Sequence, residues 1–417
     1  MPVNHPAIWA VSALTIALML LRPWKISEAV WVGSGALLLV LSRLIPFRIA
    51  WHAVGEGTDV YLFLIGMMVL AQLGQTHGVF EWLATVAIQN SNASRVRLFA
   101  LIYAVGAVVT IFMSNDATAV VLTPAVLAAV KKARTEPLPY LLSCAFIANA
   151  ASFVLPISNP ANLVVFHQSM PPLTQWLRAF TVASLLSIIA TFAALLWYCR
   201  QDLRGEANQE IEDGHLSQPG KLALAGIALV AVVLLISSAL GKDLGLPTCA
   251  ASVLVALTIC ARERTNPIEM VQGISWSVIP LVAGLFILVE AINRAGGSQV
   301  SLAALRAVAN LHPAFAAVVT SFGIGVGTNL INNLPLGLIA GTSVHQAHIT
   351  GALRNAILLG VDLGPNLSVT GSLATILWLI AIRKEGLHVS AWTFLKAGII
   401  VMPPALLLAT LAVAFIK

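Results

Sequence analysis

The sequence predicts an all-α, polytopic membrane protein with two inverted repeats, about ten transmembrane helices, two re-entrant hairpins and two broken helices. Three observations predict it: an apolar composition, a series of apolar runs, and matching interruptions in the two halves. Of the 417 residues, 59% are hydrophobic and only 10% are charged, with a mean hydropathy of +0.90. A soluble domain has about 25% charged residues. Lipid must therefore be the solvent for most of the chain.

The apolar runs give the order of the elements. The first, 7–21, ends at Arg22 without a small-residue cleavage site, so we interpret it as a retained span and not a signal peptide. The longest polar stretch, 200–220, divides the chain into halves with equal numbers of apolar segments. The runs lie at about 7–21, 29–45, 58–74, 96–113, 116–130, 139–168, 178–199, 221–240, 246–261, 274–293, 313–329, 334–348, 351–382 and 391–416.

These runs predict three parts. The first inverted repeat is 1–199, with a hairpin at 96–130 and a broken helix at 139–168. A cytoplasmic linker follows at 200–220. The second repeat is 221–417, with a hairpin at 313–348 and a broken helix at 351–382. We expect 75–94 and 298–312 to be interfacial helices that lead into the hairpins.

Polar residues interrupt an apolar run twice in each half. The first half has "FMSNDATAVVLTP" and "NAASFVLPISNPANLVVF", and the second has "GTNLINNLPLGL" and "VDLGPNLSVTGSLATILWL". Placing Asn149 opposite Asp362 also brings Asn159 opposite Ser372. Unpaired backbone groups are not tolerated in hydrocarbon, so a helix broken at mid-depth must face protein or a wet cavity. Paired interruptions of this kind predict a transporter site near the membrane midplane.

Orientation follows from the distribution of positive charge. With both ends of each hairpin on one side, most of the 23 Lys and Arg residues fall on the same face as the linker. The excess of positive charge marks that face as cytoplasmic and places both termini in the periplasm.

Two aspartates are candidates for proton coupling, because ionisable groups inside apolar segments are rare and usually functional. Asp116 lies at the first hairpin tip and Asp362 in the last broken helix. The other candidates are neutral and are predicted to bind the solute. They are Ser114, Asn115, Asn149, Ser158, Asn159, Asn162, Asn332, Asn333, Thr370 and Ser372, with Asn329 nearby. The alternative is that these residues, aspartates included, only cap helix ends.

The neutral character of these candidate residues limits the kind of solute that they can bind. No Lys or Arg occurs at these depths to balance a multiply charged anion, so a neutral, hydroxyl-rich solute or a cation is expected. No basic tract indicates nucleic-acid binding. The chain has no P-loop, and therefore no ATPase of its own. No cofactor and no metal site are expected: His345 and His348 lack a third ligand, and the four cysteines form no CxxC pair.

At these motifs the sequence resembles the arsenite efflux permease family of the ion transporter superfamily. The stretches that carry the resemblance are "GVDLGPNLSVTGSLATILWL" from Gly360, "SNDATAVVLTPAVLA" from Ser114, "INNLPLGLIAG" from Ile331 and "LPISNPANLVVF" from Leu155. The resemblance implies export of arsenite and antimonite, as undissociated hydroxides, across the cell inner membrane in exchange for protons. It also implies membrane lipid, a separate arsenical-pumping ATPase and a homodimer as partners.

Other classes stay open at this point. Relatives that carry dicarboxylates with sodium have a Ser-Asn-Thr tip in each half, whereas the tips here read Ser114-Asn115-Asp116 and Asn332-Asn333-Leu334. A sodium- or proton-coupled carrier of a dicarboxylate or another small anion is the first alternative. An intramembrane enzyme or structural subunit is the second, although the His residues lie in loops or near span ends. A passive channel is the third.

Overall fold

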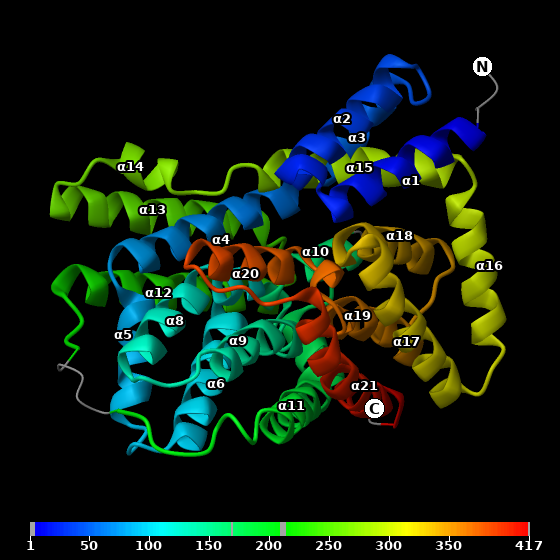
Figure 1. The fold of residues 1–417 in the computed structure, drawn as a ribbon. Coiled ribbons are helices and arrows are strands. Elements are labelled where there is room, and N and C mark those ends of the chain that lie inside the picture. The colour runs from blue at the N-terminus through cyan, green and yellow to red at the C-terminus, as the bar shows by residue number, and fades with distance from the viewer. Residues whose placement is uncertain (1–4, 168–169, 209–213, 416–417) are drawn as a thin grey trace.

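The computed structural model describes residues 5–167, 170–208 and 214–415 (Figure 1). Within these ranges the regular structure is helical, and the single β-type contact is an isolated antiparallel bridge between Ser94 and Glu206. The predicted all-α class is confirmed. The end of the predicted broken helix at 168 and the linker segment 209–213 lie outside the described residues.

Seven helices in the described part of the chain are long and apolar enough to cross a membrane. An eighth candidate is α15 (Val278–Arg294) with α16 (Gly297–Ala309), which meet at a 75° bend. The seven are α4 (Thr58–Thr76), α6 (Arg95–Phe112), α11 (Leu173–Tyr198), α12 (Gln218–Ala239), α13 (Gly245–Glu263), α17 (Pro313–Ile331) and α21 (Ala391–Phe415).

These candidates are not the ten predicted crossings one for one, because α6 and α17 belong to the predicted hairpins and several other apolar helices are short. Helix α1 (His5–Leu21) has 17 residues and α2 (Glu28–Leu41) has 14. At 1.5 Å per residue, the shorter one spans roughly 21 Å, against roughly 30 Å for the hydrocarbon core. Three other short helices lie outside the hairpins and the broken helices. They are α3 (Phe47–Glu56), α5 (Val79–Gln89) and α14 (Pro267–Gln272).

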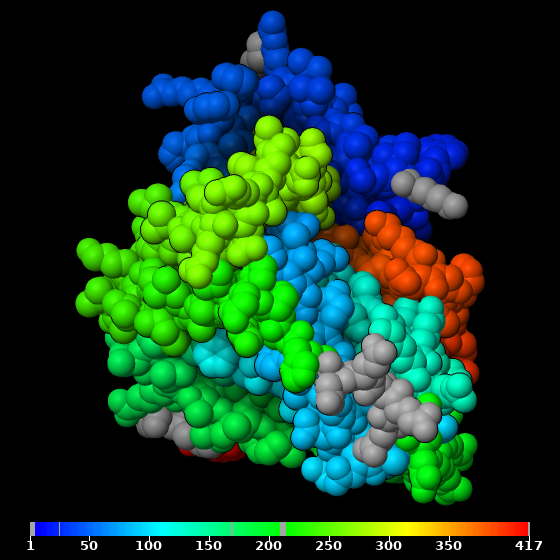
Figure 2. Space-filling view, turned by 90° about the vertical axis from the view of Figure 1, so that its left-hand side faces the viewer, coloured from blue at the N-terminus to red at the C-terminus, as the bar shows by residue number. Residues whose placement is uncertain are grey.

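The outer surface of the long helices is apolar. Only 33% of the most apolar window of α11, and the same share of α13, is buried inside the molecule. Leu246 and Leu254 of α13 are 65% and 66% exposed. The helices α1–α3, in blue, form one end of the molecule in both views (Figures 1 and 2). Exposed leucines along membrane-length helices indicate a surface that lipid covers.

Both predicted hairpins consist of two helical arms with a tip between them. In the first, α6 ends at Phe112, and the returning arm is α7 (Asn115–Ala117), η2 (Thr118–Leu122) and α8 (Thr123–Lys132). The η2 segment is a π-helix, a wide turn often found at functional sites. In the second hairpin, α17 returns as α18 (Asn333–Gln346). The helices α5 and α16 precede the hairpins, where interfacial helices were expected.

The two predicted broken helices are interrupted at their prolines. The first consists of α9 (Leu138–Ala150), η3 (Pro156–Ser158) and α10 (Pro160–Val165). The second consists of α19 (Ala352–Leu363), η4 (Gly364–Asn366), η5 (Val369–Gly371) and α20 (Leu373–Lys384). Proline lacks the N–H that would continue a helix, and Pro156, Pro160 and Pro365 each lie in the first turn of a new segment, η3, α10 and η4.

Small residues let the second hairpin pack closely on the second broken helix. A Cβ added to Gly360 of α19 would lie 2.6 Å from Ser321 O and 2.8 Å from Ile324 Cβ of α17. The Gly323–Gly327 stretch was expected to allow such packing. Gly325 fulfils this prediction, since its Cβ would lie 3.4 Å from Gly364 Cα, whereas Gly323 faces open space.

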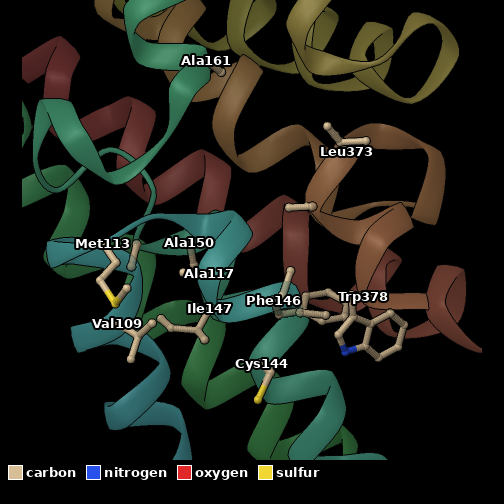
Figure 3. Packing of buried hydrophobic residues seen from close by; sticks show 14 of the residues in the cluster. Val109, Met113, Ala117, Cys144, Phe146, Ile147, Ala150, Ala161, Leu373 and Trp378 are labelled. Carbon is tan, nitrogen blue, oxygen red and sulfur yellow. The ribbon is translucent and has the colours of Figure 1, made fainter. Parts of the chain in front are cut away.

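Aromatic side chains join the two broken helices on the far side of the breaks. Phe146 of α9 and Trp378 of α20 lie in one buried cluster (Figure 3) and pack on the ring of Phe394, with centroids 4.9 and 5.6 Å away. Trp378 Nε1 donates to Leu141 O at 3.0 Å. Cys144 is fully buried in the same cluster, as a small apolar side chain would be. These aromatic contacts and the hydrogen bond hold α9 and α20 together.

Candidate functional site

Each of the four interruptions, two hairpin tips and two breaks in broken helices, is followed by a helix. A side chain from the interruption caps the N-terminus of that helix. Such a cap satisfies one of the N–H groups that a helix start leaves free. The acceptors are Ser114 Oγ for Ala117 N at 3.2 Å, Asn159 Oδ1 for Ala161 N at 2.9 Å, Asn332 Oδ1 for Leu334 N at 3.3 Å and Ser372 Oγ for Thr375 N at 3.1 Å. These four residues therefore do cap helix ends, and their binding of solute stays a prediction.

The four capped helices meet at a small crevice. Helix α10 lies between α4 and α18 (Figure 1), and the crevice opens between these elements, α7, α15 and α20. Its volume is about 10 Å³, which is room for roughly one water molecule. The lining residues are Leu64, Asn115, Asp116, Asn159, Pro160, Val278, Val282, Asn333, Leu334, Ser372, Leu373 and Ala374.

The crevice brings five of the twelve predicted residues together. Asn115 and Asp116 come from the first hairpin tip and Asn333 from the second, while Asn159 and Ser372 come from the two broken helices. Within the described part of the chain, the lining includes no Lys and no Arg. An anion placed here would have no cationic partner in the wall.

Two carbonyl oxygens in the crevice wall lack partners. Asn115 Oδ1 and Asn333 Oδ1 are buried, and neither accepts a hydrogen bond from the described residues. Both side chains are only 2% exposed. A buried polar atom without a partner is costly and therefore uncommon.

The other predicted neutral residues form hydrogen bonds within or between the interrupted segments. Asn162 Nδ2 donates to Ser152 O at 2.9 Å, and Ser158 Oγ donates to Ile111 O at 3.0 Å. Asn149 pairs with a residue of the other break, as described below. Asn332 Nδ2 donates to Thr370 O at 3.3 Å, and Thr370 Oγ1 donates to Asn329 O at 2.9 Å. Ser114 lines the neighbouring cavity and not the crevice.

The two aspartates have different surroundings. Asp116 is half-buried and lines both the crevice and a second cavity of about 90 Å³. Asp362 is fully buried and lines neither cavity. Its Oδ1 accepts from Asn159 Nδ2 at 2.9 Å, and its Oδ2 has no partner among the described residues. Asp362 therefore reaches the crevice only through Asn159.

The 90 Å³ cavity extends the crevice toward one face of the protein. It shares Leu64, Asp116, Pro160 and Val278 with the crevice and continues to Gln75, near the end of α4. On the charge argument above, this is the cytoplasmic side. A larger cavity of about 580 Å³, lined by Glu56, Asp59 and Lys242 among others, shares no lining residue with the crevice.

The 580 Å³ cavity has acidic groups in its lining. Glu56, on the short helix α3, lies 3.6 Å from His52 and also lines an adjoining cavity with Glu290. Partial burial raises the pKa of Glu56, an effect that His52 opposes and Glu290 adds to.

The sequence argument missed several residues of this region. Leu64, Val278 and Val282 form the apolar wall of the crevice, and Asn366 is a buried partner of Asn149. Asn366 follows Pro365 directly, so its place beside a break was a usable signal. No sequence signal marked the residues of the apolar wall, because they resemble any other residues in an apolar run.

A membrane-length helical bundle with broken helices meeting at mid-molecule defines a multi-pass membrane transporter. The chain belongs to the citrate transporter family, whose sequence profile matches residues 8–361.

Among its relatives, an arsenical pump membrane protein of Escherichia coli is 25% identical over 425 residues, covering 97% of each chain. A putative arsenical pump membrane protein of Bacillus subtilis is 22% identical and covers 94% of this chain and 95% of its own. These names agree with the resemblance found in the motifs. The YdaH transporter of Alcanivorax borkumensis has a similar fold, with a TM-score of 0.59, 13% identity and coverage of 99% and 98%.

Proposed function

We propose that this transporter exports trivalent metalloid, arsenite or antimonite, from the cytoplasm in exchange for protons and so confers arsenic resistance. The observation that carries the proposal is the crevice. Its polar wall is neutral apart from Asp116, and two of its residues, Asn115 and Asn333, carry buried amide oxygens without partners among the described residues. The names of the relatives support the same substrate class.

The chemistry of the solute fits this wall. An undissociated metalloid hydroxide is neutral and carries three hydroxyl donors. Two of these hydroxyls would donate to Asn115 and Asn333, and Ser372 and Asn159 offer further polar contacts. A charged anion would enter without a counter-charge, which is unfavourable at low dielectric. Because the crevice holds only about one water, it must widen before a solute enters.

The transport cycle that we propose is alternating access. The hairpins and broken helices move together against the other helices. Solute enters from the cytoplasm through the 90 Å³ cavity while Asp116 and Asp362 are ionised. Protons from the outside then bind the aspartates, and the solute is released. Asp116 lines the crevice directly, whereas Asp362 acts on the crevice through its hydrogen bond with Asn159.

Everted membrane vesicles provide the test. Arsenite uptake is measured with an imposed pH gradient, with and without an uncoupler, and antimonite is measured in the same way. We expect proton-dependent accumulation that the uncoupler abolishes. Asp116→Asn and Asp362→Asn should each abolish the accumulation, whereas Asp202→Asn, at an exposed aspartate after α11, should leave it unchanged. Proton-driven uptake that survives in both aspartate variants would refute the mechanism.

The alternative function is a sodium- or proton-coupled carrier of citrate, a dicarboxylate or another small anion. The description of the family as citrate transporters favours it. Sodium-driven uptake of citrate into the same vesicles, with no movement of arsenite, would establish this alternative. A passive channel would show equilibration without accumulation.

The partners and location that we propose follow from the same resemblance. They are the cell inner membrane, a second copy of the chain in a homodimer, and a separate arsenical-pumping ATPase that binds from the cytoplasm. Chemical cross-linking in vesicles, with and without the ATPase added, tests both interactions. Unchanged cross-linked species on addition of the ATPase would argue against that partner.

A further inference from the structure

Two side-chain contacts cross between the broken helices at equivalent positions. Asn159, before α10, donates to Asp362 of α19 at 2.9 Å. Ser372, before α20, donates to Asn149 Oδ1 of α9 over a long contact of 3.5 Å. In the register that matches the two halves, Asn159 is opposite Ser372 and Asp362 is opposite Asn149. The same crossed contact therefore occurs twice, once with a carboxyl group and once with an amide.

The contact that involves an amide, between Ser372 and Asn149, does not depend on pH. Asn149 Nδ2 donates to Asn366 Oδ1 at 3.0 Å, and Asn366 Nδ2 donates to Phe146 O at 3.1 Å. All of these groups are buried and neutral. Their hydrogen bonds do not change with pH, so this pair holds the two breaks together in every protonation state.

The contact that involves a carboxyl group, between Asn159 and Asp362, lies away from other charged groups. The elements packed against α19 are α9, α10, α17, α18, α21 and η4. Within the described chain, their titratable side chains are Tyr140 and Cys144 on α9, His345 in the last turn of α18 and Lys396 near the start of α21. On α19 itself, Arg354 lies two turns earlier and stacks on Phe166 at 4.3 Å. A change of charge on Asp362 must therefore be felt mainly by Ser152 and Asn159, the two polar side chains of the first break that interact with it, and Asn159 is the one that also lines the crevice.

Asn159 connects that charge to the crevice. Its Oδ1 caps α10 by accepting from Ala161 N at 2.9 Å, and its Nδ2 donates to Asp362. The amide is planar, so its two ends move together. Asn159 and Pro160 also line the crevice. A change in the bond to Asp362 thus changes the position of the first turn of α10 at the crevice wall.

We propose that Asp362 is a positioning residue whose protonation controls the crevice through Asn159. When ionised, Asp362 holds Asn159 and the start of α10 in the arrangement that binds solute. When protonated, it accepts a weaker hydrogen bond, because a bond to a charged acceptor is roughly twice as strong as a neutral one. The start of α10 is then freer to move, and the crevice widens beyond the arrangement that binds solute, so that the solute is released. This inference rests on the proposed function for the identity of the solute and for the protonation of Asp362 during transport.

The test uses crevice accessibility, which requires no solute. In full-length protein with its native cysteines replaced, Leu373→Cys places one thiol in the crevice wall. Its modification rate by a water-soluble maleimide is measured against pH with Asp362 intact and with Asp362→Asn. The ratio of the two rates removes the pH dependence of the thiol itself. We expect the Asp362 protein to react about fivefold more slowly at high pH, and the two rates to converge as pH falls.

Asn159→Ser is the decisive variant. Serine still caps α10 but cannot reach Asp362, so the ratio should stay near one at every pH. The matched control is Asn149→Ser, which removes the amide contact and should leave the pH-dependent ratio intact. A ratio that does not vary with pH, or that still varies in Asn159→Ser, would overturn the inference. If arsenite is not transported but these ratios behave as expected, the solute assignment fails and the inference stands.

Discussion

At the scale of single residues, the polar side chains of the breaks divide into two groups. Most of them satisfy backbone atoms that the breaks leave free, as Asn162 does for Ser152 O. Asn115 and Asn333 differ, because their side chains form no hydrogen bond with the described residues, whereas Asn162, whose Oδ1 is also unpaired, donates from Nδ2 to backbone carbonyls. A residue that stabilises the fold and a residue that awaits a ligand should respond in opposite ways to the same substitution.

Substitution by leucine separates the two groups. Asn115→Leu and Asn333→Leu remove an unpaired oxygen, so we expect thermal unfolding in detergent to be unchanged or slightly raised. The half-saturating arsenite concentration in vesicle uptake should rise about tenfold, the effect of about 1.4 kcal/mol. Asn162→Leu is the control. It leaves backbone carbonyls unpaired and should destabilise the protein by about 1–3 kcal/mol. Equal destabilisation by all three variants would show that Asn115 and Asn333 are structural.

At the scale of elements, the sequence located the breaks but not what surrounds them. Pro156, Pro160 and Pro365 cannot continue a helix, so the interruptions were predictable from local chemistry. The apolar wall formed by α4 and α15 was not predictable, because burial of an apolar residue in a membrane protein depends on its neighbours and not on its hydropathy. The π-helical turn at Thr118–Leu122 likewise has no distinct signature in the sequence.

The close packing of α17 on α19 is the element-level feature that a substitution can test. Gly360→Ala would place a Cβ 2.6 Å from Ser321 O, so one helix must shift, and we expect a loss of about 1–3 kcal/mol in stability. Gly323→Ala on α17 is the matched control, since no heavy atom lies within 4 Å of its added Cβ. That control should be neutral or slightly stabilising, because alanine favours helix. Thermal unfolding in detergent and the yield of monodisperse protein measure both effects. Similar behaviour of the two variants would contradict the packing argument.

At the scale of the whole molecule, the segment after α11 is attached to the ends of the first hairpin. Arg95, at the start of α6, donates to Glu206 O and Arg204 O, both at 3.0 Å. Ala207 N donates to Ala93 O at 2.7 Å, and Asn208 N donates to Ala133 O beyond the end of α8 at 2.9 Å. The connection between the halves therefore holds both arms of the hairpin on the face that is predicted to be cytoplasmic.

Limited proteolysis tests this attachment and the predicted orientation together. Trypsin should cut after Arg200 or Arg204 in everted vesicles, where the cytoplasmic face is outside, but not in intact spheroplasts. Arg95→Ala removes two charge-assisted hydrogen bonds and should speed the cut about fivefold or more. Arg97→Ala, whose side chain makes neither bond, is the control. Cutting in spheroplasts instead would reverse the orientation, and with it the side from which the 90 Å³ cavity admits solute.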